Sequence, residues 1–327
     1  MQILHIAIFF IWIINIDSLV IGEDQAVYEC ISCTELEVGS TFIHNGNIIT
    51  VADDEIIEAA ISRGDDLRLL CTSHLTDMSY LFSEKSDFNQ DISCWDVSNV
   101  TDMEGMFYMA SSFNHSLNSW DVSKVENMER MFAKATSFVG NISDWDVDNV
   151  YTMREMFADD SLFNGDLSHW RTSSLLDMSA MFSGAKTYNQ SMSNWNVSSV
   201  VTMSWTFLGC SRFNQDLSKW DVSKVSEMTG LFSFATDFNR DISNWNTINV
   251  NSMNYMFSHA ASFNQDISSW DVGAVEDMME MFLGAENFNQ NLSTWCVSKI
   301  REEPWDFSLE SNIEVSHLPN WGTCLTE

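Results

Sequence analysis

Nine tryptophans spaced 25 residues apart constrain this chain more than any other feature of its sequence. They are Trp95, Trp120, Trp145, Trp170, Trp195, Trp220, Trp245, Trp270 and Trp295. The residues around each tryptophan repeat with the same period, so the chain is an array of one small unit. A fixed period of this length is typical of a solenoid, in which each unit buries its apolar face by stacking on its neighbours.

Aligning the copies within the chain separates core positions from surface positions. The columns that contain Met103, Phe107 and Trp120 hold the same residue in all nine copies, which predicts that they are buried. Another column accepts almost any residue and is predicted to face solvent. Its members are Tyr80, Gly105, Arg130, Glu155, Ala180, Trp205, Gly230, Tyr255 and Glu280.

The spacing of the apolar positions predicts the secondary structure of each coil. Between Met103 and Ala110 they fall at i, i+3, i+4 and i+7, the pattern of one face of a short helix. Downstream, Trp120 and Val122 are two residues apart, as in a strand whose alternate side chains point into a core. We therefore expect one short helix and one short strand per coil.

The unit resembles the 25-residue repeat of BspA-like bacterial surface proteins, a divergent leucine-rich-repeat family. The pattern Met-Phe-x-x-Ala-x-x-Phe-Asn-x-x-Ile-x-x-Trp-Asp-Val is kept nearly intact from Met256 to Val272, and the match covers about Leu75 to Ser298. The resemblance implies an α/β repeat fold, a leucine-rich-repeat-like solenoid capped at both ends. It also implies a secreted or cell-surface protein with a role in adhesion or recognition. It implies no single partner and carries no catalytic residues.

Four segments are predicted along the chain. Residues 1–22 are largely apolar and end in Val20-Ile21-Gly22, which suits a cleavage site and indicates a secretory signal peptide. The missing basic start leaves a retained N-terminal anchor as the alternative. Residues 23–74 form an N-terminal cap, in which Asn45-Gly46 predicts a hairpin and the stretch from Asp53 to Gly64 predicts a helix. Residues 75–299 form the nine coils, and residues 300–327 form a C-terminal cap.

Six of the seven cysteines are predicted to form three bridges. Two pairs are separated by about one coil, and the third lies within the Cys-x-x-Cys of the N-terminal cap. The predicted pairs are Cys71 with Cys94, Cys296 with Cys324, and Cys30 with Cys33. The alternative for the last pair is a redox site or half of a metal site, but an exported chain meets an oxidising compartment that favours a structural bridge. Cys210 is expected to be a buried free thiol.

The charge limits the possible partners and cofactors. With 47 acidic and 15 basic residues, the formal charge is -32, which argues against binding to nucleic acid or an anionic membrane. Two columns of the repeat are partly acidic, those of Asp91 and Asp96, and stacked carboxylates of this kind suggest calcium sites as the alternative to a chain without a cofactor. Arg171 interrupts the second column, so we expect these side chains to make turn hydrogen bonds and predict no cofactor.

No enzymatic site is predicted, because the seven histidines share no column and no Ser/His/Asp set stands out. An interaction surface is indicated by large side chains in the variable column, namely Tyr80, Trp205 and Tyr255. The alternative is that these are isolated surface aromatics.

Asn99 is the best of six N-glycosylation sequons if the chain is eukaryotic, whereas in a bacterium all six would be chance matches. The predicted function is a non-enzymatic recognition or adhesion module that binds an unknown protein or glycan at a cell surface. The alternative is a structural component of a surface coat or matrix.

Overall fold

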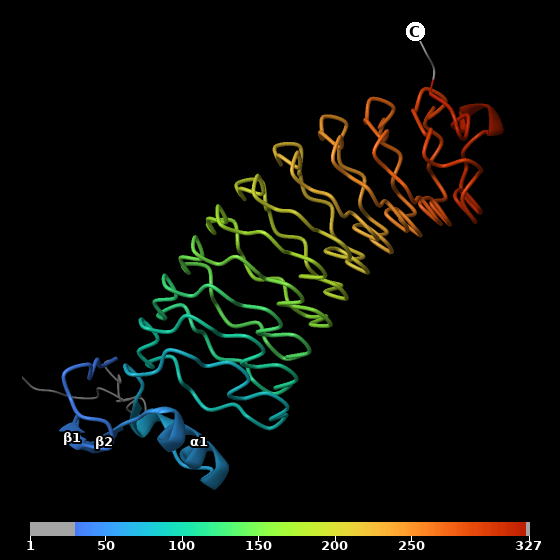
Figure 1. Ribbon diagram of the computed structural model, residues 1–327. Helices are drawn as coiled ribbons and strands as arrows, with labels where there is room; N and C mark the ends of the chain where they lie inside the picture. Colours follow the sequence, from blue (N-terminus) through green and yellow to red (C-terminus); the bar gives the residue numbers. More distant parts are fainter. Residues whose placement is uncertain (1–29, 325–327) are drawn as a thin grey trace, which may run out of the picture.

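The computed structural model describes residues 30–324 and shows a small N-terminal cap followed by a long, gently curved stack of coils (Figure 1). The predicted signal peptide, residues 1–22, lies outside the described residues. Within residues 30–324, no helix has the length and apolar character needed to cross a membrane.

The N-terminal cap begins with the predicted hairpin. Strand β1 (Thr41–His44) pairs antiparallel with β2 (Asn47–Val51). The connecting residues Asn45 and Gly46 have φ of 48° and 78°, the left-handed conformation that a two-residue hairpin turn requires and that Asn-Gly adopts readily. The hairpin prediction is confirmed.

The predicted cap helix is also present, as α1 (Asp54–Arg63). The Asp53 side chain accepts a hydrogen bond from the N–H of Ile56 at its start, and Gly64 ends it with a φ of 75°. These are the capping roles in which aspartate and glycine are favoured. A short 3₁₀ helix, η1 (Leu67–Leu69), follows.

Strand β3 (Leu70–Cys71), which was not predicted, pairs parallel with β2. It directly precedes the first coil, so the cap and the coil stack are joined through this sheet.

The coils are stacked with one repeat per layer. Parallel bridges join Asp77 to Asp102, Asp102 to Asn127, and so on at 25-residue steps to Asp277. One core runs along the whole stack, and the Met, Phe and Trp columns predicted to be buried are at most 5% exposed.

Aromatic rings form ladders inside this core. The centroids of Phe107 and Phe132 are 5.4 Å apart, and those of Trp120 and Trp145 are 6.4 Å apart. The indole N–H of Trp120 donates to the carbonyl of Ile92 over 3.1 Å. Each tryptophan therefore buries a large apolar ring while its single donor remains satisfied.

The prediction of a helix in each coil is wrong. Within residues 30–324 the only α-helix is α1, and the segment from Met103 to Ala110 forms consecutive turns. The N–H of Met106 bonds to the carbonyl of Met103 within the coil, whereas the N–H of Gly105 bonds to that of Glu129 in the next coil. A helix of eight residues has little stability alone, and the turns direct half of the N–H groups to a neighbouring coil. The i, i+3, i+4, i+7 spacing identified the buried side chains but not the backbone.

The predicted strand around Trp120 and Val122 is also absent. Here the N–H of Trp120 bonds to the carbonyl of Leu117, and the N–H of Val125 bonds to that of Val122. The Asp121 carboxylate accepts from the N–H of Ser123. Side chains that bond to nearby backbone groups compete with strand pairing, so the extended bridge of each coil lies instead at the position of Asp102.

The variable column has an unexpected backbone conformation. All nine members have positive φ, for example 56° at Tyr80, 55° at Gly105 and 61° at Trp205, and so does the column four residues later, which contains Met109. This conformation is costly for residues other than glycine. It is held in place by inter-coil hydrogen bonds such as that from the N–H of Trp205 to the carbonyl of Thr229.

Two of the three predicted disulfides are wrong. Cys296–Cys324 is present, with Cα atoms 4.2 Å apart, and Cys210 is a buried free thiol as predicted. The observed pairs in the cap are Cys30–Cys94 and Cys33–Cys71, not Cys71–Cys94 and Cys30–Cys33.

The reason for the different pairing is the path of the N-terminal segment. Cys33 packs with Ile49 and Val51 of the hairpin against Cys71 in β3, while Cys30 lies beside Cys94 of the first coil, with their Cα atoms 4.5 Å apart. The two bridges therefore attach this segment to both the cap sheet and the coils.

The C-terminal segment continues the stack as a partial coil. The N–H groups of Glu280 and Phe282 bond to the carbonyls of Trp305 and Phe307. A 3₁₀ helix, η2 (Val315–His317), follows. The rings of Phe307 and Trp321 meet edge-on with centroids 4.9 Å apart, which covers the end of the core.

Tyr188 provides a test of the aromatic ladder, because it occupies a column that is otherwise phenylalanine. It is fully buried and its hydroxyl has no hydrogen-bond partner. Tyr188→Phe is therefore expected to leave stability unchanged or to raise it by about 1 kcal/mol, since an unsatisfied buried hydroxyl is destabilising. Urea unfolding measures this, with the exposed Tyr151→Phe as control. A loss above about 1 kcal/mol would mean that the hydroxyl has a partner.

Candidate functional site: the turn face

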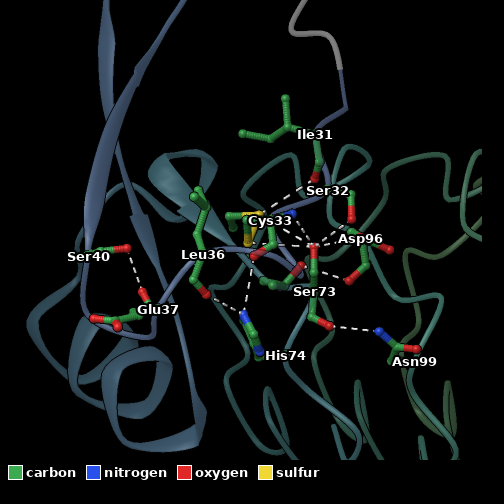
Figure 2. The surroundings of a disulfide bond; sticks show 12 residues. Ile31, Ser32, Cys33, Leu36, Glu37, Ser40, Ser73, His74, Asp96 and Asn99 are labelled. Carbon is green, nitrogen blue, oxygen red and sulfur yellow. Dashed lines mark hydrogen bonds between the residues drawn. A yellow bond between two sulfur atoms is a disulfide. The ribbon is translucent and has the colours of Figure 1, made fainter.

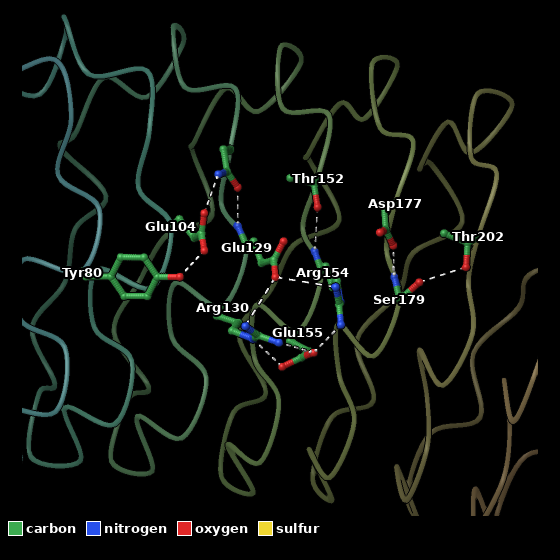
Figure 3. Close-up of polar contacts among 11 residues, drawn as sticks. Tyr80, Glu104, Glu129, Arg130, Thr152, Arg154, Glu155, Asp177, Ser179 and Thr202 are labelled. Atoms are coloured by element: carbon green, nitrogen blue, oxygen red, sulfur yellow. Dashed lines mark hydrogen bonds and ion pairs between the residues drawn. The ribbon is translucent and has the colours of Figure 1, made fainter.

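The turn segment of each coil presents one set of side chains outward. In the second coil Glu104, Tyr108 and Met109 reach the surface, Gly105 is covered by the ring of Tyr80, and Met106 and Phe107 between them are buried. We name the four positions of Glu104, Gly105, Tyr108 and Met109, together with their counterparts at 25-residue intervals, the turn face. Figure 3 shows how several of its side chains lie along neighbouring coils.

In the first coils, polar and charged side chains of the turn face bond to one another. The hydroxyl of Tyr80 donates to the carboxylate of Glu104, and this hydrogen bond raises the pKa of Tyr80 to about 12 (Figure 3). Tyr80 is 47% exposed. Its ring lies where a Cβ on Gly105 would be, so glycine in the next coil is what makes room for it.

An ion-pair network follows in the next coils. The guanidinium of Arg130 donates two hydrogen bonds to Glu155, of 2.7 and 3.0 Å. This hydrogen bonding lowers the pKa of Glu155. Arg154 lies 3.3 Å from Glu155 and 3.9 Å from Glu129. The positive charges of this region are thus balanced by neighbouring carboxylates. Exposed pairs of this kind contribute little to stability.

Farther along, two of the three predicted interface residues come together. Trp205 and Tyr255 are two coils apart, yet their ring centroids are 5.7 Å apart. The coil between them carries Gly230, and a Cβ added there would overlap the indole ring. Glycine therefore lets Trp205 reach across to Tyr255. Tyr80 lies in the charged part of the turn face and does not join them.

Sequence reasoning missed a second aromatic contact on the same face. The rings of Phe234 and His259 stack with centroids 4.5 Å apart, and Phe234 is 49% exposed. Both belong to the column of Met109, which is as variable as the column of Tyr80. Examining that second variable column for large side chains would have identified them.

The turn face is neutral over four consecutive coils. From Leu175 to Ala274 it contains no Asp, Glu, Lys or Arg. We name these residues the neutral segment: Ser179, Ala180, Ser183, Gly184, Ser204, Trp205, Leu208, Gly209, Thr229, Gly230, Ser233, Phe234, Asn254, Tyr255, Ser258 and His259. The four coils before it carry charged residues at Glu84, Glu104, Glu129, Arg130, Lys134, Arg154, Glu155 and Asp159.

A serine, a histidine and an aspartate meet where the cap joins the coils (Figure 2). The hydroxyl of Ser73 donates to Asp96 over 2.6 Å. Burial raises the pKa of Asp96, but hydrogen bonds from Ser73 and Ser98 outweigh it and the net shift is downward. The Nε2 of His74 lies 3.2 and 3.0 Å from the carbonyls of Cys33 and Leu36. This geometry lacks the serine–histidine hydrogen bond that a nucleophile and its base require, and it ties the N-terminal segment to the coils.

A pocket of about 150 Å³ lies between the hairpin and the first coil. Apolar side chains such as Ile31, Leu70 and Trp95 line it, together with His44 and Asn47. Ligand pockets are usually larger, roughly 300–1,000 Å³. The exposed turn face is therefore the stronger candidate for binding.

The two partly acidic columns make turn hydrogen bonds. Asp91 accepts from the N–H of Ser93, and Asp96 accepts from the N–H of Ser98. In the part of the chain that the structure describes, no three or more His, Cys, Asp or Glu side chains are grouped to hold a metal ion.

Asn99, the predicted glycosylation site, makes hydrogen bonds through both the nitrogen and the oxygen of its side-chain amide. Its Nδ2 donates to the carbonyl of Ser73 over 2.9 Å, and its Oδ1 accepts from the Nζ of Lys124 over 2.7 Å. A glycan would attach to the same nitrogen, so modification would disturb this contact between the cap and the coils.

The chain is similar to a known protein family. The sequence model of the family described as "Mycoplasma protein of unknown function, DUF285" matches residues 55–170, 134–233 and 201–321. These overlapping matches extend from the cap helix through all the coils to the C-terminal cap. No curated protein and no solved structure matches the chain.

Proposed function

The chain belongs to the family described as "Mycoplasma protein of unknown function, DUF285", and from this premise we propose that it is a non-enzymatic recognition or adhesion module that binds at a cell surface. The proposal includes a leucine-rich-repeat-like solenoid of the BspA-like type, an extracellular location and a cleaved signal peptide at residues 1–22. The partner is a protein or glycan of another surface.

The observation that carries the proposal is the contrast between constant core and varied turn face. Every coil repeats the same buried methionine, phenylalanine and tryptophan, while the turn face changes from charged to neutral and aromatic along the stack. A rigid framework that displays different side chains at regular intervals is the arrangement that repeat proteins use to form extended binding surfaces. Exposed tryptophan and tyrosine are frequent anchors at such surfaces.

Three disulfides support an extracellular location, because such bridges persist in oxidising compartments. The acidic composition supports solubility outside the cell.

The second candidate, a component of a surface coat or matrix, is favoured by the exposed end of the stack. Trp305 and Val315 are 73% and 85% exposed, and Leu309 is 52% exposed. Apolar side chains at one end of an elongated molecule favour association between copies.

One experiment separates the two candidates. The full chain is secreted through an oxidising pathway, labelled, and measured for binding to intact cells and for its size by sedimentation, with and without a calcium chelator. Saturable binding by the monomer is expected. Absence of cell binding together with large assemblies would contradict recognition and support the coat component.

A further inference from the structure

Resting on the proposed function, we propose that the neutral segment of the turn face binds a neutral glycan, with the rings of Trp205 and Tyr255 as the platform on which sugar rings stack.

The charge of the surface excludes the simplest alternatives. The chain has a formal charge of -32, yet the neutral segment holds no carboxylate, lysine or arginine. An anionic ligand would find no lysine or arginine there to pair with. Because binding removes water from the charged group, its lost hydration would not be compensated. A cationic partner would be attracted to the acidic parts of the chain instead. The matching ligand carries no charge.

The rings are held in place before any ligand arrives. The indole of Trp205 lies over Gly230 and contacts Tyr255. The hydroxyl of Tyr255 lies 3.9 Å from the sulfur of Met279. A side chain fixed by its neighbours loses little conformational freedom on binding, which favours affinity.

Polar groups of the right kind stand directly beside the rings. Ser204, Thr229 and Asn254 precede Trp205, Gly230 and Tyr255 in successive coils. Their hydroxyl and amide groups both donate and accept hydrogen bonds. The hydroxyl of Thr229 already bonds to Ser252 and the amide of Asn254 to Asp277 and Met279, and each keeps a further donor or acceptor position for a ligand. A neutral sugar presents C–H groups on its ring faces, which pack on aromatic rings, and hydroxyls at its edges, which also donate and accept. The alternation of ring and polar side chain along the coils matches this chemistry.

A protein partner fits less well. Serine is depleted at protein–protein interfaces, whereas three of the residues in the neutral segment that reach the surface are serines: Ser179, Ser183 and Ser204. The stack also offers similar positions at each coil, which suits a ligand that is itself a chain of similar units.

The test measures binding of the labelled full chain to cells before and after chemical treatment. Exhaustive periodate oxidation, which cleaves the vicinal diols of sugars, is expected to reduce binding about tenfold or more. Mild periodate, which oxidises only sialic acid, is expected to leave it within twofold. Binding that survives exhaustive oxidation and is lost after protease treatment would overturn the glycan proposal in favour of a protein ligand. Loss after mild oxidation would overturn the claim that the ligand is neutral.

Matched variants locate the site. Trp205→Ala and Tyr255→Ala are each expected to weaken binding about tenfold, as for an anchor residue, and Trp205→Phe should recover part of the affinity. Tyr80→Ala is the control, because it removes an exposed aromatic of the same column from the charged coils, and it should change affinity less than twofold. Equal binding by Trp205→Ala and the unaltered chain would overturn the site. Absence of cell binding by the unaltered chain would contradict the proposed function itself, and the glycan proposal with it.

Discussion

Asp160→Ala is expected to stabilise the protein by up to about 4 kcal/mol at pH 8. Asp160 occupies a buried column that is alanine in most other coils, and it is 0% exposed. Neither carboxyl oxygen has a hydrogen-bond partner. Burial raises its pKa to about 7, and the backbone N–H groups of Leu162 and Phe163, which lie near the carboxylate without making a hydrogen bond of normal geometry, reverse only part of that shift. The magnitude follows from about 1.4 kcal/mol for each unit between this value and the ordinary value of 3.8.

The pH dependence of this effect has a definite sign. Since the folded protein holds the Asp160 proton more tightly than the unfolded chain does, its stability decreases as pH rises from about 4 to about 7. The gain in Asp160→Ala should therefore be about 2–3 kcal/mol smaller at pH 5 than at pH 8. Urea unfolding of the two proteins at both pH values measures the difference, in which the titration of all other groups cancels.

Asp159→Asn is the matched control, since Asp159 is the exposed neighbour of Asp160 and asparagine tolerates its left-handed backbone as aspartate does. It should change stability by less than about 0.5 kcal/mol at both pH values. A stability gain in Asp160→Ala that does not vary with pH would show that Asp160 keeps the same charge in the folded and unfolded states, contrary to its burial.

Phe182→Ala is expected to destabilise the protein by about 3–5 kcal/mol, the usual cost of removing a large buried side chain. Its ring is fully buried in the middle of the stack, with centroids 4.0 Å from Tyr188 and 5.7 and 5.9 Å from Phe157 and Phe207. Because coils contact mainly their neighbours, the loss should also divide the stack. Hydrogen exchange should accelerate most in the coils adjacent to Phe182, and urea unfolding should become less cooperative.

Two further variants complete this experiment. Phe182→Leu keeps most of the buried volume and should cost about 1.5 kcal/mol. Leu176→Ala removes a large apolar side chain that is 45% exposed in the same coil, and should cost less than about 0.5 kcal/mol. A loss of similar size for Phe182→Ala and Leu176→Ala would mean that the phenylalanine ladder does not hold adjacent coils together.

Much of the candidate site could be located from the sequence, because nine copies in one chain reveal which positions vary. Trp205 and Tyr255 were identified as exposed aromatics in a variable column, and the structure brings them into contact. Their meeting depends on Gly230 in the coil between them, and the stacking of Phe234 on His259 depends on a second column. Neither contact follows from the residues of one coil, since each is made by side chains that lean across to the next layer.

The sequence by itself determined the repeat length, the residues of the core, and the hairpin and helix of the N-terminal cap. Apolar residues at fixed positions must be buried together, and Asn-Gly and the caps of α1 act through neighbouring residues. Only the tertiary structure decided the backbone of each coil and the disulfide partners Cys30–Cys94 and Cys33–Cys71. The N–H groups of Gly105 and Met109 bond to carbonyls 24 residues away. These partners exist only once the coils are stacked, and they favour turns where the local pattern favours a helix.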